Sequence, residues 1–348
     1  MDALSLSAAD ILALPLTHAG DIFDRQEAAA KHVLGLLRSK WHPDKCSDVQ
    51  ASTVFYRLTE LYDHSRTLAA GPLWITSSAV YFQYDGSTVT FKYVHADATD
   101  ISRVFIANGY VMEVFNPDAA DLGDAYVKNV QTLTFADGAM EKQMRPQLPK
   151  VVRDYVVDDY RIVVVSKTPG TYRLSDVVRS HPDLLTPTHV AWIVSGLLNH
   201  ACYLRYAERV HAGITLSNIY IQPDTHMVCI IGGWWSAVKQ GSKLSAVPAD
   251  VIPVLPRTVI SSRRADLTLN TTLIRAACRE LLGDRTGSRL LMNKKLPKAM
   301  VTWAMGIGGD AVEDYRYWLN EVLVSCFGKR TFVDFGRITN ATVYRKEK

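Results

Sequence analysis

Apolar residues in the first 70 positions recur with the spacing of helices. One helix is predicted from about Gln26 to residue 41 and a second from about Val49 to Leu68. Their apolar stripes consist of Ala29, Val33, Leu37 and Trp41 in the first helix and of Phe55, Leu58 and Tyr62 in the second. The segment Asp24–Glu27 has the form of a capping box at the start of the first helix. Pro43 ends that helix, because proline disfavours helical geometry in the preceding residue. The sequence therefore predicts two antiparallel helices joined by a tight loop.

After Gly71-Pro72 the pattern changes to strands rich in β-branched and aromatic residues. Residues 73–94 read as a hairpin that turns at Tyr84-Asp85-Gly86-Ser87. A second hairpin is predicted from Ile101 to Phe115, with Asn108-Gly109 as its turn. Residues 121–135 look helical, and Tyr160–Val165 reads as a buried strand because almost every residue is apolar.

Beyond about Pro169 the helical period dominates. The predicted elements are helices Thr188–Arg209, Asp266–Leu282 and Asp310–Phe327 and short strands Ile219–Ile221 and Met227–Ile231. Strands followed by helices describe a two-lobed α+β domain. The expected division is helices in 1–70, a connecting aromatic hairpin in 71–95, a mostly β lobe in 96–168 and a mostly α lobe in 169–348.

Composition sets broad limits on the function. The chain has 348 residues, 48% of them hydrophobic and 21% charged, which is usual for a globular protein. A net charge of +4 is too small to indicate nucleic-acid binding without a basic cluster. The five cysteines form no CxxC pair, so we expect neither a zinc site nor a disulfide framework. Without a recognisable signal peptide or membrane-spanning stretch, the expected location is the cytoplasm, with no membrane partner.

The segment His42-Pro43-Asp44 lies at the end of the first long helix and follows the aromatic Trp41. Asp10–Leu14 reads as a short helix before this segment. After the segment, Phe55–Tyr62 carries aromatic and aliphatic residues at helical spacing. In this register, residues 8–68 resemble a J-domain, the module by which DnaJ-type co-chaperones engage DnaK-type heat-shock ATPases.

The resemblance implies that His42, Pro43 and Asp44 contact a DnaK-type chaperone and trigger ATP hydrolysis. A preformed loop loses little conformational freedom when it docks. In the family, the helix before the loop carries a basic face, here reduced to Lys31, Arg38 and Lys40. Gly35 and Leu36 stand where the family commonly has Lys or Arg.

Residues from about 96 to 335 resemble the protein-kinase fold. The segment from His211 to Asn218, followed by the strand Ile219–Ile221, is similar to the kinase catalytic loop. The strand that leads into Gly232-Gly233 occupies the place before the kinase D-F-G motif. Asp266 resembles the aspartate that anchors the catalytic loop from a helix of the large lobe.

The same comparison implies that the catalytic groups are missing. Phosphoryl transfer needs a base near the substrate hydroxyl and positioned cations. Gly213 stands in place of the base, and Gly232 or Gly233 in place of the metal-binding aspartate. Glu113 occupies the strand that carries the phosphate-binding lysine in kinases, and Asn218 alone matches. We therefore expect a pseudokinase with no catalytic residues, no metal and no cofactor.

Other features of the sequence allow two interpretations. Trp234-Trp235 either fills the vacated nucleotide cleft, which we favour, or forms an exposed aromatic platform. The aromatic hairpin either packs on a neighbour or contacts a client. Lys294-Lys295 and residues 345–348 are expected on the solvated surface and tail.

The main hypothesis is a non-enzymatic co-chaperone or adaptor, whose J-domain recruits a DnaK-type ATPase and whose pseudokinase module binds a protein client or an assembly. The alternative is a structural scaffold with a vestigial loop, which Gly35 and Leu36 favour. An atypical phosphotransferase is a third and more distant hypothesis. The combination of modules resembles proteins encoded by large bacteriophages, which would place the chain in the host cytoplasm or the virion.

Overall fold

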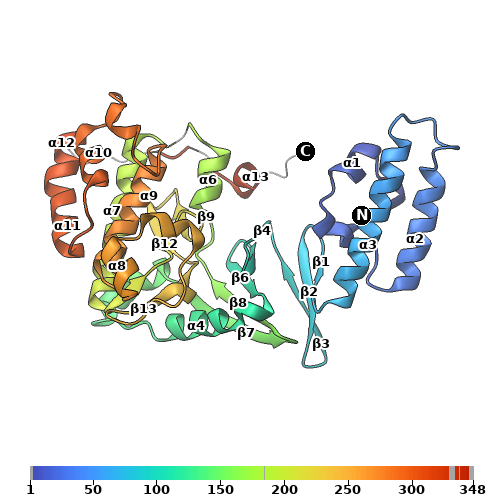
Figure 1. The fold of residues 1–348 in the computed structure, drawn as a ribbon, viewed down its shortest axis with the longest axis horizontal. Coiled ribbons are helices and arrows are strands. Elements are labelled where there is room, and N and C mark those ends of the chain that lie inside the picture. The colour runs from blue at the N-terminus through green and yellow to red at the C-terminus, as the bar shows by residue number, and fades with distance from the viewer. Residues whose placement is uncertain (1–2, 184, 329–333, 337, 345–348) are drawn as a thin grey trace.

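The computed structural model describes residues 3–183, 185–328, 334–336 and 338–344. It shows a mixed α+β architecture in which N-terminal helices precede several antiparallel sheets. Figure 1 shows these helices at one end, a small sheet beside them, a larger sheet next, and a helical lobe at the far end. The expected tail of residues 345–348 lies outside the described residues.

The N-terminal part is helical, as predicted. Its helices are α1 (Ala8–Ala13), α2 (Glu27–Lys40) and α3 (Ala51–Ala70), with 3₁₀ turns at Ala3–Ser5 and Leu16–Asp21. Their shared core contains Ile11, Phe23, Leu37, Leu58 and Leu61.

Two details of this part differ from prediction. Asp24 does not cap α2, because its carboxylate accepts from the Gln26 amide in a local turn and the helix begins only at Glu27. The loop before α3 is also longer than predicted, since Val49 is 97% exposed and the helix begins at Ala51. Asp48 forms a similar local turn with the Gln50 amide just before α3.

The connecting hairpin is part of a three-stranded sheet. Its strands are β1 (Trp74–Ile75), β2 (Ala79–Tyr84) and β3 (Ser87–Lys92), in the order β1-β2-β3. Asp85 and Gly86 form the predicted turn, and both have positive φ. The small sheet contacts both of its neighbours, because Trp74 is buried in the helical core whereas Val80 and Phe82 pack against the larger sheet.

The larger sheet has five antiparallel strands in the order β4-β5-β6-β8-β7. They are β4 (His95–Ala98), β5 (Ser102–Ile106), β6 (Tyr110–Phe115), β7 (Lys150–Val157) and β8 (Tyr160–Ser166). Side chains alternate between the two faces of a strand. Accordingly, Val163 and Val165 enter the core of the helical lobe, whereas Ile162 and Val164 enter the core beneath the hairpin. Burial on both faces explains the unbroken apolar run predicted as a buried strand.

Helix α4 (Ala120–Gln131) follows β6 and packs against β8 and the segment around Trp234. The remaining helices are α5 (Gly138–Met144), α6 (Leu174–Ser180), α7 (Pro187–Tyr206), α8 (Arg257–Ser262), α9 (Thr268–Leu281), α10 (Lys298–Met305), α11 (Ala311–Tyr317), α12 (Leu323–Phe327) and α13 (Asn340–Val343). The short strands are β9 (Tyr172–Arg173), β10 (Arg209–His211), β11 (Ile219–Gln222), β12 (Met227–Ile230) and β13 (Ala237–Lys239).

Most predicted elements of this lobe are present, with shifted ends. The long helix ends at Tyr206, and Arg209 already belongs to β10. Residues 311–327 are helical throughout, but Trp318–Val322 form a π-helical turn. Its tryptophan is fully buried and donates to the Ser195 hydroxyl at 2.9 Å. Among the described residues, no helix is both long and apolar enough to cross a bilayer.

The junction between the helices and the small sheet is closely packed. The Asp21 carboxylate accepts from the Ser77 amide at 2.7 Å, and the Arg25 guanidinium donates to the Gly71 carbonyl. A Cβ atom added to Gly20 would lie 2.4 Å from the backbone oxygen of Ile75. This backbone cannot move without displacing the β1–β2 ladder, so the junction requires glycine.

We expect Gly20→Ala to lower the free energy of unfolding by about 1–3 kcal/mol, the usual cost of overpacking. Gly35→Ala is the matched control, because nothing lies within 4 Å of the added Cβ on exposed α2. That change should stabilise the protein by up to about 1 kcal/mol. Urea unfolding of the three proteins measures both effects. Equal stability of Gly20→Ala and the wild type would contradict the close packing.

Candidate functional site

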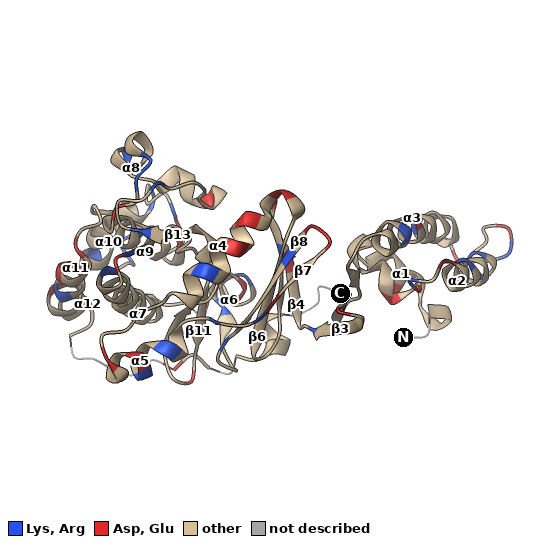
Figure 2. Ribbon diagram, turned by 90° about the horizontal axis from the view of Figure 1, so that it is seen from below, with Lys and Arg blue, Asp and Glu red and all other residues tan. Residues whose placement is uncertain are grey.

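The loop between α2 and α3 presents a polar tip. Pro43 and Asp44 are exposed, and the Asp44 carboxylate is 87% accessible and caps no helix. The His42 side chain stabilises the turn, because its Nδ1 accepts from the Asp44 amide at 3.2 Å. Its ring also packs edge-on against Phe55 of α3, with 5.8 Å between the ring centroids. The loop is thus fixed at its base, and its charged tip faces solvent (Figure 2).

The three basic residues predicted beside this loop already have partners within the chain. Lys31 forms an ion pair with Glu27 at 2.5 Å. The Arg38 guanidinium donates to the Thr59 hydroxyl at 2.7 Å and lies over the Phe55 ring. The Lys40 ammonium donates to the Leu4 and Leu6 carbonyls. The basic face of α2 is therefore weaker than its sequence suggests.

The predicted catalytic-loop positions meet in the helical lobe. A Cβ atom on Gly232 would lie 2.3 Å from the Asn218 side-chain oxygen, and one on Gly213 would lie 3.1 Å from the Gly233 carbonyl. The Asn218 amide donates to the Gly213 carbonyl at 3.0 Å. The three glycines thus allow two backbone segments to touch at the positions that the sequence comparison aligned with kinase aspartates. Asn218 holds these segments together and is not directed at an open site.

The backbone of this loop is anchored differently from prediction. Asp266 was expected to hold it, but the Asp266 carboxylate accepts from the amide and hydroxyl of Thr268 at the start of α9. These hydrogen bonds lower the pKa of Asp266. Asn270 takes the anchoring role, since its side chain accepts from the His211 amide at 2.9 Å and donates to the Arg209 carbonyl.

His211 is fully buried and packs edge-on against Trp234, with 4.7 Å between the ring centroids. Burial lowers the pKa of His211 to about 3, so the imidazole is neutral near pH 7. Trp234 is buried as well, so it forms no exposed aromatic platform, whereas Trp235 remains partly exposed. The two tryptophans therefore have different environments.

Glu113 is a buried carboxyl on β6. It accepts from the Ser102 hydroxyl at 2.8 Å and shares the inner face of the strand with Val111 and Phe115. Burial raises the pKa of Glu113 to about 7, although the Ser102 hydrogen bond opposes the shift. A carboxyl in this environment cannot attract phosphate as a lysine would.

Helix α4 is attached to the segment that follows β12. The Tyr126 hydroxyl donates to the Ile231 carbonyl at 2.5 Å, and the Asn129 amide donates to the carbonyls of Trp234 and Ala237. These bonds hold the helix against the loop 231–237 by neutral contacts. Among the described residues, no group of three or more His, Cys, Asp or Glu could hold a metal ion.

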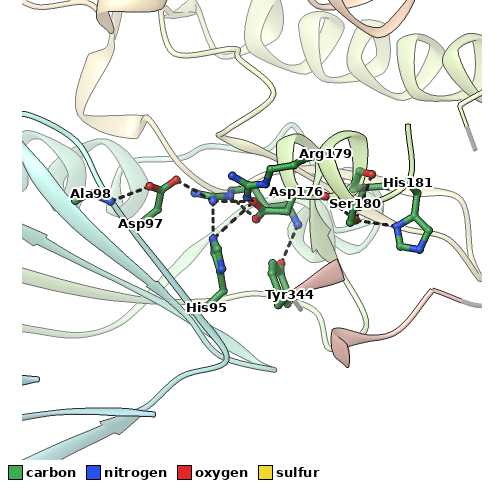
Figure 3. Close-up of polar contacts among 10 residues, drawn as sticks. His95, Asp97, Ala98, Asp176, Arg179, Ser180, His181 and Tyr344 are labelled. Carbon is green, nitrogen blue, oxygen red and sulfur yellow. Dashed lines mark hydrogen bonds and ion pairs between the residues drawn. The ribbon is translucent and has the colours of Figure 1, made fainter. Parts of the chain in front are cut away.

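A charged network lies between β4 of the larger sheet and α6 of the helical lobe (Figure 3). Asp176 of α6 is fully buried and accepts two hydrogen bonds from Arg173, at 2.7 and 3.0 Å, and a further one from Arg179. Arg173 also donates to Asp97 of β4 at 3.0 Å. The network therefore ties the first strand of the sheet to the helical lobe.

His95 of β4 and Tyr344 after α13 complete this network. Their rings stack with centroids 5.0 Å apart, and the Tyr344 hydroxyl accepts from the Arg173 amide. Because a guanidinium only donates, the His95 Nε2 atom that lies 3.0 Å from Arg173 must accept, so His95 is neutral here. Burial is the main reason that the pKa of His95 lies below its usual value.

Sequence reasoning located the loop and glycine positions but missed this network and Asn270. The Arg173–Asp176 pair has helical i,i+3 spacing, yet such pairs are usually solvated, and nothing in the sequence marks this one as buried. Neither the comparison with protein-family models nor that with curated proteins yields a match to this chain. The function must therefore be argued from the residues and their geometry.

The neutral state of His95 makes the network sensitive to acid. A histidine whose pKa is lower in the folded than in the unfolded state stabilises the fold above pH 6.5, and this stability is lost as the pH falls through the folded value. Protonated His95 would repel Arg173 and Arg179, although Asp97 and Asp176 oppose this effect. Each tenfold difference in proton affinity corresponds to about 1.4 kcal/mol.

We expect acidification from pH 7.5 to 5.5 to destabilise the wild type more than His95→Gln, which retains an acceptor that does not titrate. The difference between the two proteins isolates His95. In both proteins Glu113 has the opposite effect, so that acidification stabilises the fold through this residue. Its pKa is raised from 4.5 to about 7, and the stability that this shift contributes is lost as the pH rises through that range. Urea unfolding at the two pH values measures the difference, and parallel losses would contradict the role of His95.

Proposed function

We propose that the chain is a J-domain co-chaperone or adaptor that stimulates a DnaK-type ATPase. The observation that carries this proposal is the loop 42–44, whose Pro43 and Asp44 are exposed while His42 is braced by Phe55. The loop joins two antiparallel helices with a common core, so it is preformed for docking.

We further propose that residues from about 96 onward form a non-catalytic kinase-like module. In kinases a lysine on the third strand pairs with a glutamate of the following helix. Here β6, the third strand of the five-stranded sheet in chain order, also precedes a helix packed on the sheet, and this arrangement supports the comparison. Glu113 and Asn129 stand where the charged pair would be, and glycines contact one another where the two aspartates would be.

The kinase-like module then serves to bind a protein client or an assembly. The helical part offers only a small surface around its loop. The larger part has replaced the residues that bind a nucleotide in kinases, so a protein is its more plausible ligand. The small sheet packs against both neighbours, so a client bound to the larger module would be held at a defined position relative to the loop.

The second candidate function is a structural scaffold in which the loop is vestigial. The engagement of Lys31, Arg38 and Lys40 within the chain favours it, because steering toward an acidic chaperone surface needs free positive charge. The two functions differ in whether the chain accelerates a chaperone ATPase.

We expect the wild-type protein to accelerate single-turnover ATP hydrolysis by a DnaK-type chaperone, and His42→Gln to reduce that acceleration at least about tenfold. This loss corresponds to about 1.4 kcal/mol, comparable to one hydrogen bond to a charged group. His32→Gln is the matched control, because His32 is exposed on α2 away from the loop. Absence of acceleration by all three folded proteins would favour the scaffold.

A second test concerns the proposed loss of nucleotide binding. We expect ATP with magnesium to leave the thermal unfolding midpoint unchanged, because the cleft has no phosphate-binding cation on β6. Ligand at 100 times its Kd would add about 2.7 kcal/mol of stability, which is readily measured. A rise that requires both ATP and magnesium would revive the phosphotransferase hypothesis.

A further inference from the structure

A groove of about 900 Å³ runs along α4, between this helix and the segment that contains β10 and β13. The helix lines it from Asp121 to Thr132, a length of about 16 Å at the helical rise per residue. A fully extended chain covers about 3.3 Å per residue, so about five residues of a peptide fit this length. The groove is separate from the glycine contacts and from the loop 42–44.

The groove has small apolar residues along it and one large aromatic side chain. Ala125, Ala237 and Val238 line it with Trp235. Trp235 is partly exposed and makes no hydrogen bond within the described residues, in contrast to Trp234, whose indole donates to the Ile230 carbonyl. A half-exposed indole provides a contact for an apolar or aromatic side chain and a free N–H donor.

One end of the groove is basic. Lys128 and Lys239 are exposed, and neither forms an ion pair in the part of the chain that the structure describes. Arg209 lies opposite Lys239 in the β10–β13 ladder and donates to Asn129 and Thr132. Glu208 adds one acidic group to this wall. The beginning of α4 is acidic and its end is basic, as Figure 2 shows. At the helical rise per residue, Asp121 lies about 10 Å from Lys128 along the helix axis.

The strand beside the groove has one backbone donor on its outer edge without a partner among the described residues. The Ala237 amide donates to the Trp234 carbonyl, the Ala237 carbonyl accepts from Asn129, and the Lys239 carbonyl accepts from the Ser242 amide. β13 pairs only with β10 among the described strands. The Gln240 amide donates to the Glu208 carbonyl, and hydrogen-bonded pairs alternate along an antiparallel ladder. The amide of Lys239 is therefore directed to the edge away from β10, where an extended peptide could accept its hydrogen bond.

We propose that this groove binds an extended peptide segment of a partner protein, with an acidic side chain at the Lys128–Lys239 end and an apolar side chain on Trp235. The proposal rests on the adaptor role proposed above and identifies the surface and the peptide class for it. Charge complementarity selects the acidic residue, and an extended chain suits the length of the groove and can accept from the Lys239 amide.

The test selects peptides from a displayed library of random linear sequences on the folded full chain, without any chaperone. We expect the recovered peptides to be enriched in Asp and Glu. Their binding should weaken at least about tenfold in Trp235→Ala, which removes the aromatic contact. Lys128→Glu and Lys239→Glu should each weaken binding about fivefold, with a smaller effect at high salt.

Lys142→Glu on α5 is the matched control, since this lysine does not line the groove and should leave binding unchanged. Failure to enrich any peptide, or equal binding to all variants, would overturn the proposal. Self-association of the chain that Trp235→Ala abolishes would assign the groove to a second copy and also overturn it. Because no chaperone is present, failure here is distinguishable from failure of the His42 test.

Discussion

The strands β6 and β8 direct alternate side chains into two different hydrophobic cores. One core joins the five-stranded sheet to the helical lobe, and the other joins it to the small sheet, which in turn holds Trp74 in the core of the N-terminal helices. Three cores in series thus connect the exposed loop at one end to the helical lobe at the other (Figure 1). A sheet buried on only one face would leave the N-terminal helices as a flexibly attached unit.

Within this frame, polar contacts hold both the interior of the helical lobe and its junction with the sheet. Gly213, Gly232 and Gly233 let the backbone segments approach until Asn218 bridges them. At the junction, the buried Asp176 accepts from Arg173, which is also buried, and from Arg179, whose side chain is 64% exposed. Removing one partner of a buried ion pair usually costs several kcal/mol, so such a network resists opening.

The loop 42–44 and the groove beside α4 are chemically different surfaces. The loop 42–44 is a rigid projection whose acidic tip is supported by an aromatic contact. The groove beside α4 is a concave surface with an indole in its lining and, at one end, two exposed lysines that form no ion pair among the described residues. In the proposed adaptor role, the loop would contact one protein and the groove another, and a preformed surface loses little conformational freedom on binding.

The sequence by itself determined the elements whose signals are local. Helical spacing, the Asp85-Gly86 turn and the apolar run of β8 depend on neighbouring residues, and the structure contains all three. The loop 42–44 and the three glycines could also be located, because short motifs carry their own spacing. The tertiary structure alone decided which polar residues are buried. Asp176, Arg173 and His95 meet across about 80 positions of the chain, and Asn270 anchors a loop that Asp266 was expected to hold. Such choices depend on which surfaces fold together, because a charged residue looks the same in sequence whether its partner lies in water or in a core.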